Sequence, residues 1–181
     1  MPTIPAPPNP SPPCQIQPFA WRDWLALWQL RRQQLAEDGI LMDSPLPTEP
    51  DPSSPYEQDY HRIDQVYLAG RGGFWIAWLD ALPVGHIGAE DRGQYLELRR
   101  MYVRQGYRRR GIGRQLVQAL IDHCSAEGVP AVELWTAPDG PGRLLYETLG
   151  FFRIAAPHGE RDGEEDDPEM RMRLDVAELR Q

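Results

Sequence analysis

Four arginines and two glycines stand together near the middle of the chain, in a pattern that suits a phosphorylated ligand. They lie between an apolar segment and an amphipathic one, and the run reads Arg108, Arg109, Arg110, Gly111, Ile112, Gly113 and Arg114. If a helix begins here, its first backbone N–H groups lack partners within the helix, and the helix dipole adds positive charge. Glycine keeps side chains away and permits positive φ. The run therefore predicts a pyrophosphate site at the start of a helix.

Two common nucleotide-binding patterns do not fit this run. A Walker-type loop needs a lysine before serine or threonine, but all 19 Lys+Arg positions of this chain are arginine. A dinucleotide fingerprint needs a third glycine, and Leu116 occupies that place. What remains is Arg-x-x-Gly-x-Gly after an apolar strand. This pattern resembles the coenzyme A pyrophosphate loop of the GNAT superfamily, the acyl-CoA-dependent N-acyltransferases.

The resemblance extends to both sides of the loop. Residues 96–103 look like the fourth strand of the family, and residues 144–151, Leu-Leu-Tyr-Glu-Thr-Leu-Gly-Phe, look like its last helix and the turn that follows. The resemblance implies an α/β fold with a mixed, mostly antiparallel central sheet and helices on both faces. It also implies acetyl-CoA as cofactor, with its arm against Met101, Tyr102 and Val103 and its pyrophosphate held by residues 108–114. Asp139 stands where the family often has asparagine at the cofactor.

Acyl transfer to an amine needs a base for the amine and a proton for the leaving thiolate. Tyr146 matches the tyrosine of the family that points at the cofactor sulfur; the alternative is a tyrosine that only packs in the core. Glu97 is the candidate base, and its alternative is a structural ion pair with Arg99 or Arg100. Strand alternation puts Glu97, Arg99, Met101 and Val103 on one face unless a bulge intervenes. His86 and His61 are further candidates for the base.

Composition limits the classes of function. The net charge is −8, which argues against nonspecific nucleic-acid binding. No apolar run is long enough to cross a membrane, and no secretory signal is evident, so we expect a cytoplasmic protein. Cys14 and Cys124 lie far apart and match no metal spacing, so no metal site is expected.

The hydrophobic pattern divides the chain into a tail and one domain. Residues 1–13 are rich in proline and are expected to form a disordered tail, and residues 14–177 form the domain. Expected helices cover residues 20–37, 56–69, 112–127 and 140–149, and expected strands cover 14–19, 74–78, 84–89, 94–103, 131–136, 151–155 and 170–176. The tryptophans of the first helix are expected to face the core. Residues 158–168 are expected to form an exposed acidic loop.

These observations predict an N-acetyltransferase that moves the acetyl group of acetyl-CoA to a primary amine by direct attack in a ternary complex. The alternative is a domain that binds acyl-CoA as a sensor, with Glu97 and Tyr146 structural. The acceptor is expected to be a small molecule, but its charge stays open. Arg99 or Arg100 would attract an anionic group, whereas the acidic loop would attract a cation. Dimers are common among similar proteins, and the sequence does not decide whether this chain is one.

Overall fold

Seven strands form one sheet within residues 13–42, 45–155 and 169–180, the parts of the chain that the computed structural model describes. Along the sheet they lie in the order β1, β2, β3, β4, β5, β7, β6. Their bounds are β1 Gln15–Pro18, β2 Gly73–Leu79, β3 Leu82–Asp91, β4 Leu96–Val103, β5 Ala131–Thr136, β6 Phe152–Ile154 and β7 Met170–Asp175. The helices are α1 Trp24–Glu37, α2 Gln58–His61, α3 Ile63–Val66, α4 Ile112–Ala126 and α5 Pro141–Thr148, with 3-10 turns η1 Trp21–Asp23, η2 Gln105–Tyr107 and η3 Val176–Arg180.

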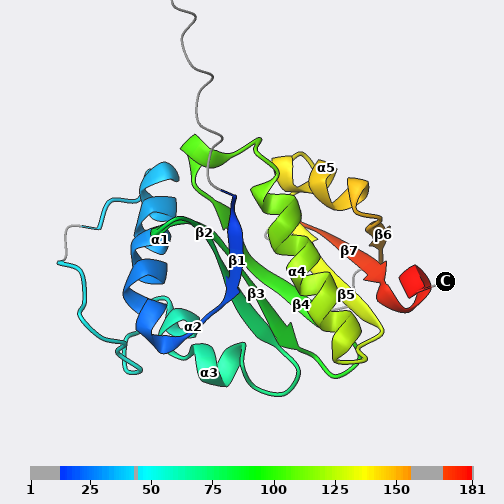
Figure 1. Cartoon of the computed structure of the whole chain (residues 1–181), viewed down its shortest axis with the longest axis horizontal. Helices are drawn as coiled ribbons and strands as arrows, with labels where there is room; N and C mark the ends of the chain where they lie inside the picture. Colours follow the sequence, from blue (N-terminus) through cyan, green and yellow to red (C-terminus); the bar gives the residue numbers. More distant parts are fainter. Residues whose placement is uncertain (1–12, 43–44, 156–168, 181) are drawn as a thin grey trace, which may run out of the picture.

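The junction of β4 and β5 interrupts an otherwise antiparallel sheet. These two strands run parallel, and they pair only where Leu96 meets Val132 and Glu97 meets Glu133. Beyond Glu97 the strands separate, so the backbone of β4 from Leu98 onward has no ladder partner on the β5 side. In Figure 1 the long helix α4 crosses in front of this part of the sheet. The expected mixed, mostly antiparallel α/β fold is confirmed.

α4 covers one face of the sheet because its apolar residues recur at helical spacing. Ile112, Leu116, Leu120 and Cys124 are spaced by four residues, and all four are buried. They join a core cluster with side chains from β2, β3, β4, β5 and β7, and α5 contributes Tyr146 to the same cluster. Full burial of each Leu or Ile stabilises the fold by roughly 1.5–3 kcal/mol. This face therefore fixes the start of α4 beside β4.

α1, α2 and α3 cover the opposite face with an aromatic cluster (Figure 1). Trp24 and Trp28 of α1 are buried there and stack on each other with ring centroids 5.6 Å apart. The core position expected for these tryptophans is confirmed, whereas Trp21 in the turn before α1 is 44% exposed. Tyr60 and Tyr67 pack on the same side of the sheet against Phe74 of β2.

Several expectations change in detail. The helix expected over residues 56–69 is wrong, since two four-residue helices stand there and Arg62 between them leaves helical geometry with φ −129° and ψ 41°. The expected acidic loop and all but the last residue of the expected tail lie outside the described residues. Across the described ranges, no helix combines the length and the apolar character needed to cross a membrane.

Candidate active site

An open cleft of about 620 Å³ lies where β4 and β5 separate. Its walls bring together the two candidate catalytic residues, Glu97 from β4 and Tyr146 from α5. The remaining lining residues are Leu98, Arg99, Arg100, Met101, Trp135, Thr136, Ala137, Gly142 and Glu169. A second cavity of about 990 Å³ lies between the β2–β3 turn and the start of α4, but its lining includes neither candidate. The β4–β5 cleft is therefore the place where their chemistry could meet.

A bulge in β4 decides which side chains share a face of this cleft. The register with β3 shifts between His86 and Gly88, and Arg100 has a φ of 54° in the left-handed region. Met101 and Val103 pack against the core cluster under α4, as Leu96 and Leu98 do. Because the extra residue reverses the alternation, Glu97 and Arg99 point to the opposite face. The expectation that Glu97, Arg99, Met101 and Val103 share one face is thus wrong.

The loop before α4 has the form of an anion site. Arg109 and Gly111 both have positive φ, 64° and 78°, and no side chain caps the first turn of α4. A Cβ on Gly113 would lie 3.2 Å from both Met101 and Leu145. The two glycines therefore have separate roles, since Gly111 supplies the backbone conformation and Gly113 permits close packing. Free N–H groups at a helix start, with positive charge around them, fit a diphosphate.

The arginines of this loop are not equivalent. Arg108 donates from Nε to the Val103 carbonyl oxygen at 2.8 Å and from Nη2 to Glu37 at 2.9 Å, so it holds the loop to β4 and α1. Arg114 donates to the Thr148 hydroxyl at 3.2 Å. Arg110 lies over the ring of Tyr107, whereas Arg109 is exposed. Arg109 and Arg110 are the guanidinium groups most open to a ligand in this loop.

Tyr146 presents a hydroxyl that no described residue uses. The side chain is buried, and burial raises the pKa of the phenol to about 12, so it stays protonated at neutral pH. Its ring packs on Phe151 with centroids 5.6 Å apart. A Cβ on Gly142 would lie 3.2 Å from the Tyr146 ring, so glycine leaves room for it. The phenol can therefore donate a hydrogen bond into the cleft.

Glu97 is a buried carboxylate with a partner that the sequence interpretation missed. It is 7% exposed, and its Oε2 accepts hydrogen bonds from the Arg92 guanidinium at 2.7 Å. Arg92 belongs to the turn between β3 and β4, and the structural ion pair expected with Arg99 or Arg100 does not form. The only available signal was Arg92-Gly93, which marks a turn short enough to bring residue 92 beside residue 97.

The model of the acetyltransferase (GNAT) family matches residues 24–151, which is most of the chain. The chain belongs to the GNAT acetyltransferase family. The GNAT domain supports an acyltransferase.

Curated relatives of this GNAT chain match about half of its length. It is 35% identical over 99 residues to the "Probable N-acetyltransferase camello" of Xenopus tropicalis, covering 52% of this chain and 45% of that protein. It is also 35% identical over 100 residues to the N-acetylaspartate synthetase of Danio rerio, covering 53% of this chain and 36% of that protein. The chain thus spans less than half the length of these relatives.

Solved structures show the same fold over nearly the whole GNAT chain. An acetyltransferase of the GNAT family from Staphylococcus aureus Mu50 superposes with a TM-score of 0.71 at 21% identity, covering 91% of this chain and 99% of that one. The PaiA N-acetyltransferase of Thermoplasma acidophilum, solved in complex with coenzyme A, superposes with a TM-score of 0.60 at 17% identity, covering 90% and 99%.

The remaining predicted site residues of this GNAT domain lie at the margin of the cleft. Tyr102 points away into the aromatic cluster, where its hydroxyl donates to Glu37 at 3.0 Å, so only its backbone can face the cleft. Asp139 is exposed in the turn between β5 and α5 and does not line the cleft. The aromatic residues in its lining are Trp135 and Tyr146.

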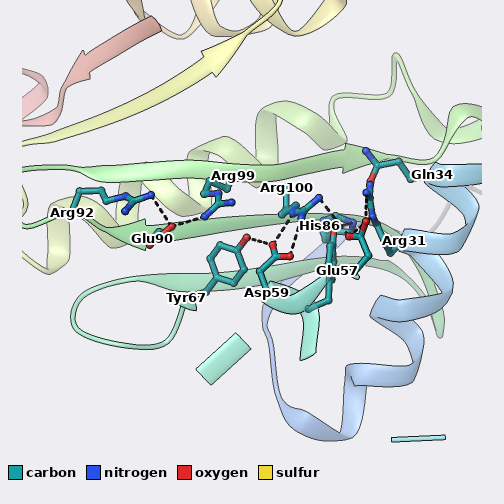
Figure 2. Close-up of polar contacts among 11 residues, drawn as sticks. Arg31, Gln34, Glu57, Asp59, Tyr67, His86, Glu90, Arg92, Arg99 and Arg100 are labelled. Atoms are coloured by element: carbon teal, nitrogen blue, oxygen red, sulfur yellow. Dashed lines mark hydrogen bonds and ion pairs between the residues drawn. The ribbon is translucent and has the colours of Figure 1, made fainter. Parts of the chain in front are cut away.

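A network of ion pairs links α1 and the segment that contains α2 to the bulge in β4 (Figure 2). Arg100 donates from Nε and Nη2 to the two oxygens of Asp59 at 2.7 and 2.8 Å, and Arg31 of α1 holds Glu57 in the same way at 2.9 and 2.8 Å. Burial alone would raise the pKa of Asp59, but hydrogen bonds from Arg100 and Tyr67 outweigh it and lower that pKa. The segment that contains α2 is thereby fixed over the sheet.

The candidate histidine bases lie outside the cleft. His86 is fully buried, and burial lowers its pKa to about 3, which the nearby Arg100 backbone only partly opposes. His61 accepts a hydrogen bond at Nδ1 from the Asp51 backbone at 3.0 Å and packs against Trp28. Neither lines the cleft. Among the described residues, no group of three or more His, Cys, Asp or Glu could hold a metal ion.

Proposed function

We propose that this GNAT domain, residues 14–177, transfers the acetyl group of acetyl-CoA to a primary amine by direct attack in a ternary complex. The observation that carries the proposal is the cleft between β4 and β5, whose walls hold a buried carboxylate and a tyrosine hydroxyl without a hydrogen-bond partner in the described chain. The coenzyme A held by the PaiA neighbour and the name of the N-acetylaspartate synthetase relative support the same reading.

The N–H groups at the start of α4 hold the diphosphate of the acyl carrier, with Arg109 and Arg110 nearest to it. The backbone of β4 at Met101, Tyr102 and Val103, which has no ladder partner on the β5 side, runs along its arm. When bound, acetyl-CoA supplies the thioester acetyl group. Direct attack then needs only a neutral amine, and no covalent intermediate on the protein is required.

The two catalytic groups act on protons. Glu97 accepts the proton of the acceptor amine, directly or through a water, while its pair with Arg92 keeps the carboxylate oriented. Tyr146 donates a hydrogen bond to the leaving thiolate. The raised pKa of Tyr146 suits this role, because the hydroxyl keeps its proton across the working pH range.

The test is thiol release from acetyl-CoA over a broad panel of primary amines, with acetyl-CoA affinity measured by calorimetry. Glu97→Gln should lower kcat by about 10²-fold and leave acetyl-CoA affinity unchanged. Glu133→Gln is the matched control. Glu133 is also buried, pairs with Arg171 and Arg173, and lies opposite Glu97 in the ladder, but it does not line the cleft. Equal activity of Glu97→Gln and Glu133→Gln would remove Glu97 from the mechanism.

A further inference from the structure

Arg99 in the cleft has a free hydrogen-bonding edge that other arginines of this protein use to bind carboxylates. An arginine grips a carboxylate best with its Nε and Nη2 together. Arg31, Arg71 and Arg100 each use this edge on a carboxylate of the protein, namely Glu57, Asp91 and Asp59. Arg99 donates only from Nη1, to Glu90 at 2.6 Å, and its Nε and Nη2 have no hydrogen-bond partner in the described chain.

The position of Arg99 makes this edge useful. The side chain is 27% exposed and lines the cleft together with Glu97. The two residues precede the bulge and are two positions apart on one strand, so their side chains leave the same face about 7 Å apart. Glu90 anchors Arg99 by Nη1, as Arg92 anchors Glu97. An oriented carboxylate and an oriented guanidinium thus stand side by side in the cleft.

This pair of opposite charges fits a ligand that carries an amine and a carboxylate close together. Because both side chains line one cleft, the amine of such a ligand can pair with the Glu97 carboxylate while its carboxylate pairs with the Arg99 guanidinium. A polyamine or an aminoglycoside offers Arg99 no anionic group with which to form an ion pair. The arginine beside it is no substitute, because Arg100 is already committed to Asp59 and Glu57.

We propose that the acceptor is an amino acid, whose carboxylate binds the Nε–Nη2 edge of Arg99 while its amine lies at Glu97. This inference rests on the proposed function for the role of Glu97, but the carboxylate site itself does not. Arg99 is then the residue that selects acceptors with an anionic group over purely cationic amines, the choice that the sequence leaves open.

The experiment compares free L-amino acids with their α-amides and with the corresponding amines that lack the carboxylate. Each is titrated by calorimetry into the protein saturated with coenzyme A, and each is assayed for turnover with acetyl-CoA. We expect at least one free acid to bind and react about tenfold or more better than its amide, because only the acid pairs with Arg99. Arg99→Gln should abolish that preference, and Arg99→Lys should restore part of it, since lysine keeps the charge without the fork.

Two variants separate recognition from folding. Arg173→Gln removes an arginine of similar exposure, 29%, that pairs with Glu133 and Asp175 outside the cleft, and it should leave the preference intact. Glu90→Gln removes the carboxylate that anchors Arg99 through Nη1, so it should weaken the preference for the acid less than Arg99→Gln does. Thermal melting of all four variants confirms that they are folded.

The outcomes also separate this inference from the proposed function. Acids and amides that bind and react equally well, an unchanged preference in Arg99→Gln, or no binding of any free acid would each overturn the inference. Arg99-dependent binding of an acid without acetyl transfer would leave the inference standing and remove the proposed function. Equal turnover of amines without a carboxylate by wild type and Arg99→Gln, with no Arg99-dependent binding of an acid, would support the proposed function and overturn the inference.

Discussion

The Tyr146 hydroxyl lies in the cleft wall and makes no hydrogen bond within the described chain, so its removal should affect chemistry and spare stability. We predict that Tyr146→Phe lowers kcat by on the order of 10²-fold, because the leaving thiolate loses a donor in a site of low polarity. The free energy of unfolding should change by less than about 0.5 kcal/mol, since the ring still packs on Phe151.

Thiol-release kinetics and urea denaturation of the same preparations test this prediction. Tyr107→Phe is a suitable control, because Tyr107 lies beside the α4 loop and does not line the cleft. A Tyr146→Phe protein with normal kcat would show that the tyrosine only packs in the core.

At single residues, the sequence predicted which side chains share the cleft better than it predicted their partners. Tyr146 and Glu97 were predicted from motif and strand, and both line the same cleft. The partner of Glu97 was missed because an ion pair across a turn depends on how the turn folds, and Arg92 reaches Glu97 only in the folded hairpin. Likewise, the sequence does not distinguish the neighbours Arg99 and Arg100. In the structure, the bulge directs Arg100 to Asp59, whereas Arg99 keeps a free Nε–Nη2 edge in the cleft.

At the scale of elements, the loop before α4 contains a glycine whose effects on stability and on acetyl-CoA binding can be measured separately. Gly111 has a φ of 78° and open space around its Cβ position, and Gly93 in the β3–β4 turn has a φ of 79° and the same open space. We predict that Gly111→Ala and Gly93→Ala both lower the free energy of unfolding by about 1 kcal/mol, because alanine is strained at this φ. Only Gly111→Ala should weaken acetyl-CoA binding, as measured by calorimetry. Equal affinities of the two variants for acetyl-CoA would mean that the α4 loop does not hold the cofactor.

The network that fastens α2 to β4 makes a second prediction at this scale. Asp59→Asn leaves Arg100 half-buried without its bidentate carboxylate, and we expect a loss of about 3 kcal/mol in the free energy of unfolding. Faster amide hydrogen exchange should appear in α2 and α3, which the pair holds down. The control is Glu147→Gln, which breaks an exposed pair with Arg143 and should change stability by less than about 0.5 kcal/mol. A loss in Asp59→Asn as small as in the control would show that packing alone holds this segment.

Long, strongly periodic elements were predictable, and short ones were not. The apolar spacing predicted α4 to within one residue of its end, and six of its apolar positions are buried. The segment at residues 56–69 lacks such a stripe, and its two short helices are held by Arg100, Asp59 and buried tyrosine rings instead. The bulge at Arg100 could not be read from the sequence, because an arginine at positive φ carries no local signal.

For the whole molecule, the two faces of the sheet differ in how they respond to pH. The α4 face buries the aromatic rings of Trp75, Tyr146 and Phe151 among aliphatic side chains, whereas the α1–α3 face buries His86, Tyr60 and Tyr67. Burial raises the pKa of both tyrosines, so the folded state keeps phenol protons that the unfolded chain releases near pH 10. Stability should therefore decrease as pH rises above about 10.

The stability below neutral pH gives the sharper prediction, because His86 changes protonation between the pKa values of the folded and unfolded states. Burial holds its pKa at about 3, against about 6.5 in the unfolded chain, so between these values the unfolded state binds a proton that the folded state does not. The free energy of unfolding should therefore decrease by about 1.4 kcal/mol for each pH unit below about 6. Urea denaturation at several pH values between about 7 and 5.5 measures this slope above the range in which the carboxyl groups titrate. His86→Leu, a side chain of similar size without a titrating group, should remove most of it, and His61, whose pKa is also lowered, accounts for what remains. The same slope in wild type and His86→Leu would show that His86 binds its proton in the folded protein, and that the aromatic face admits water.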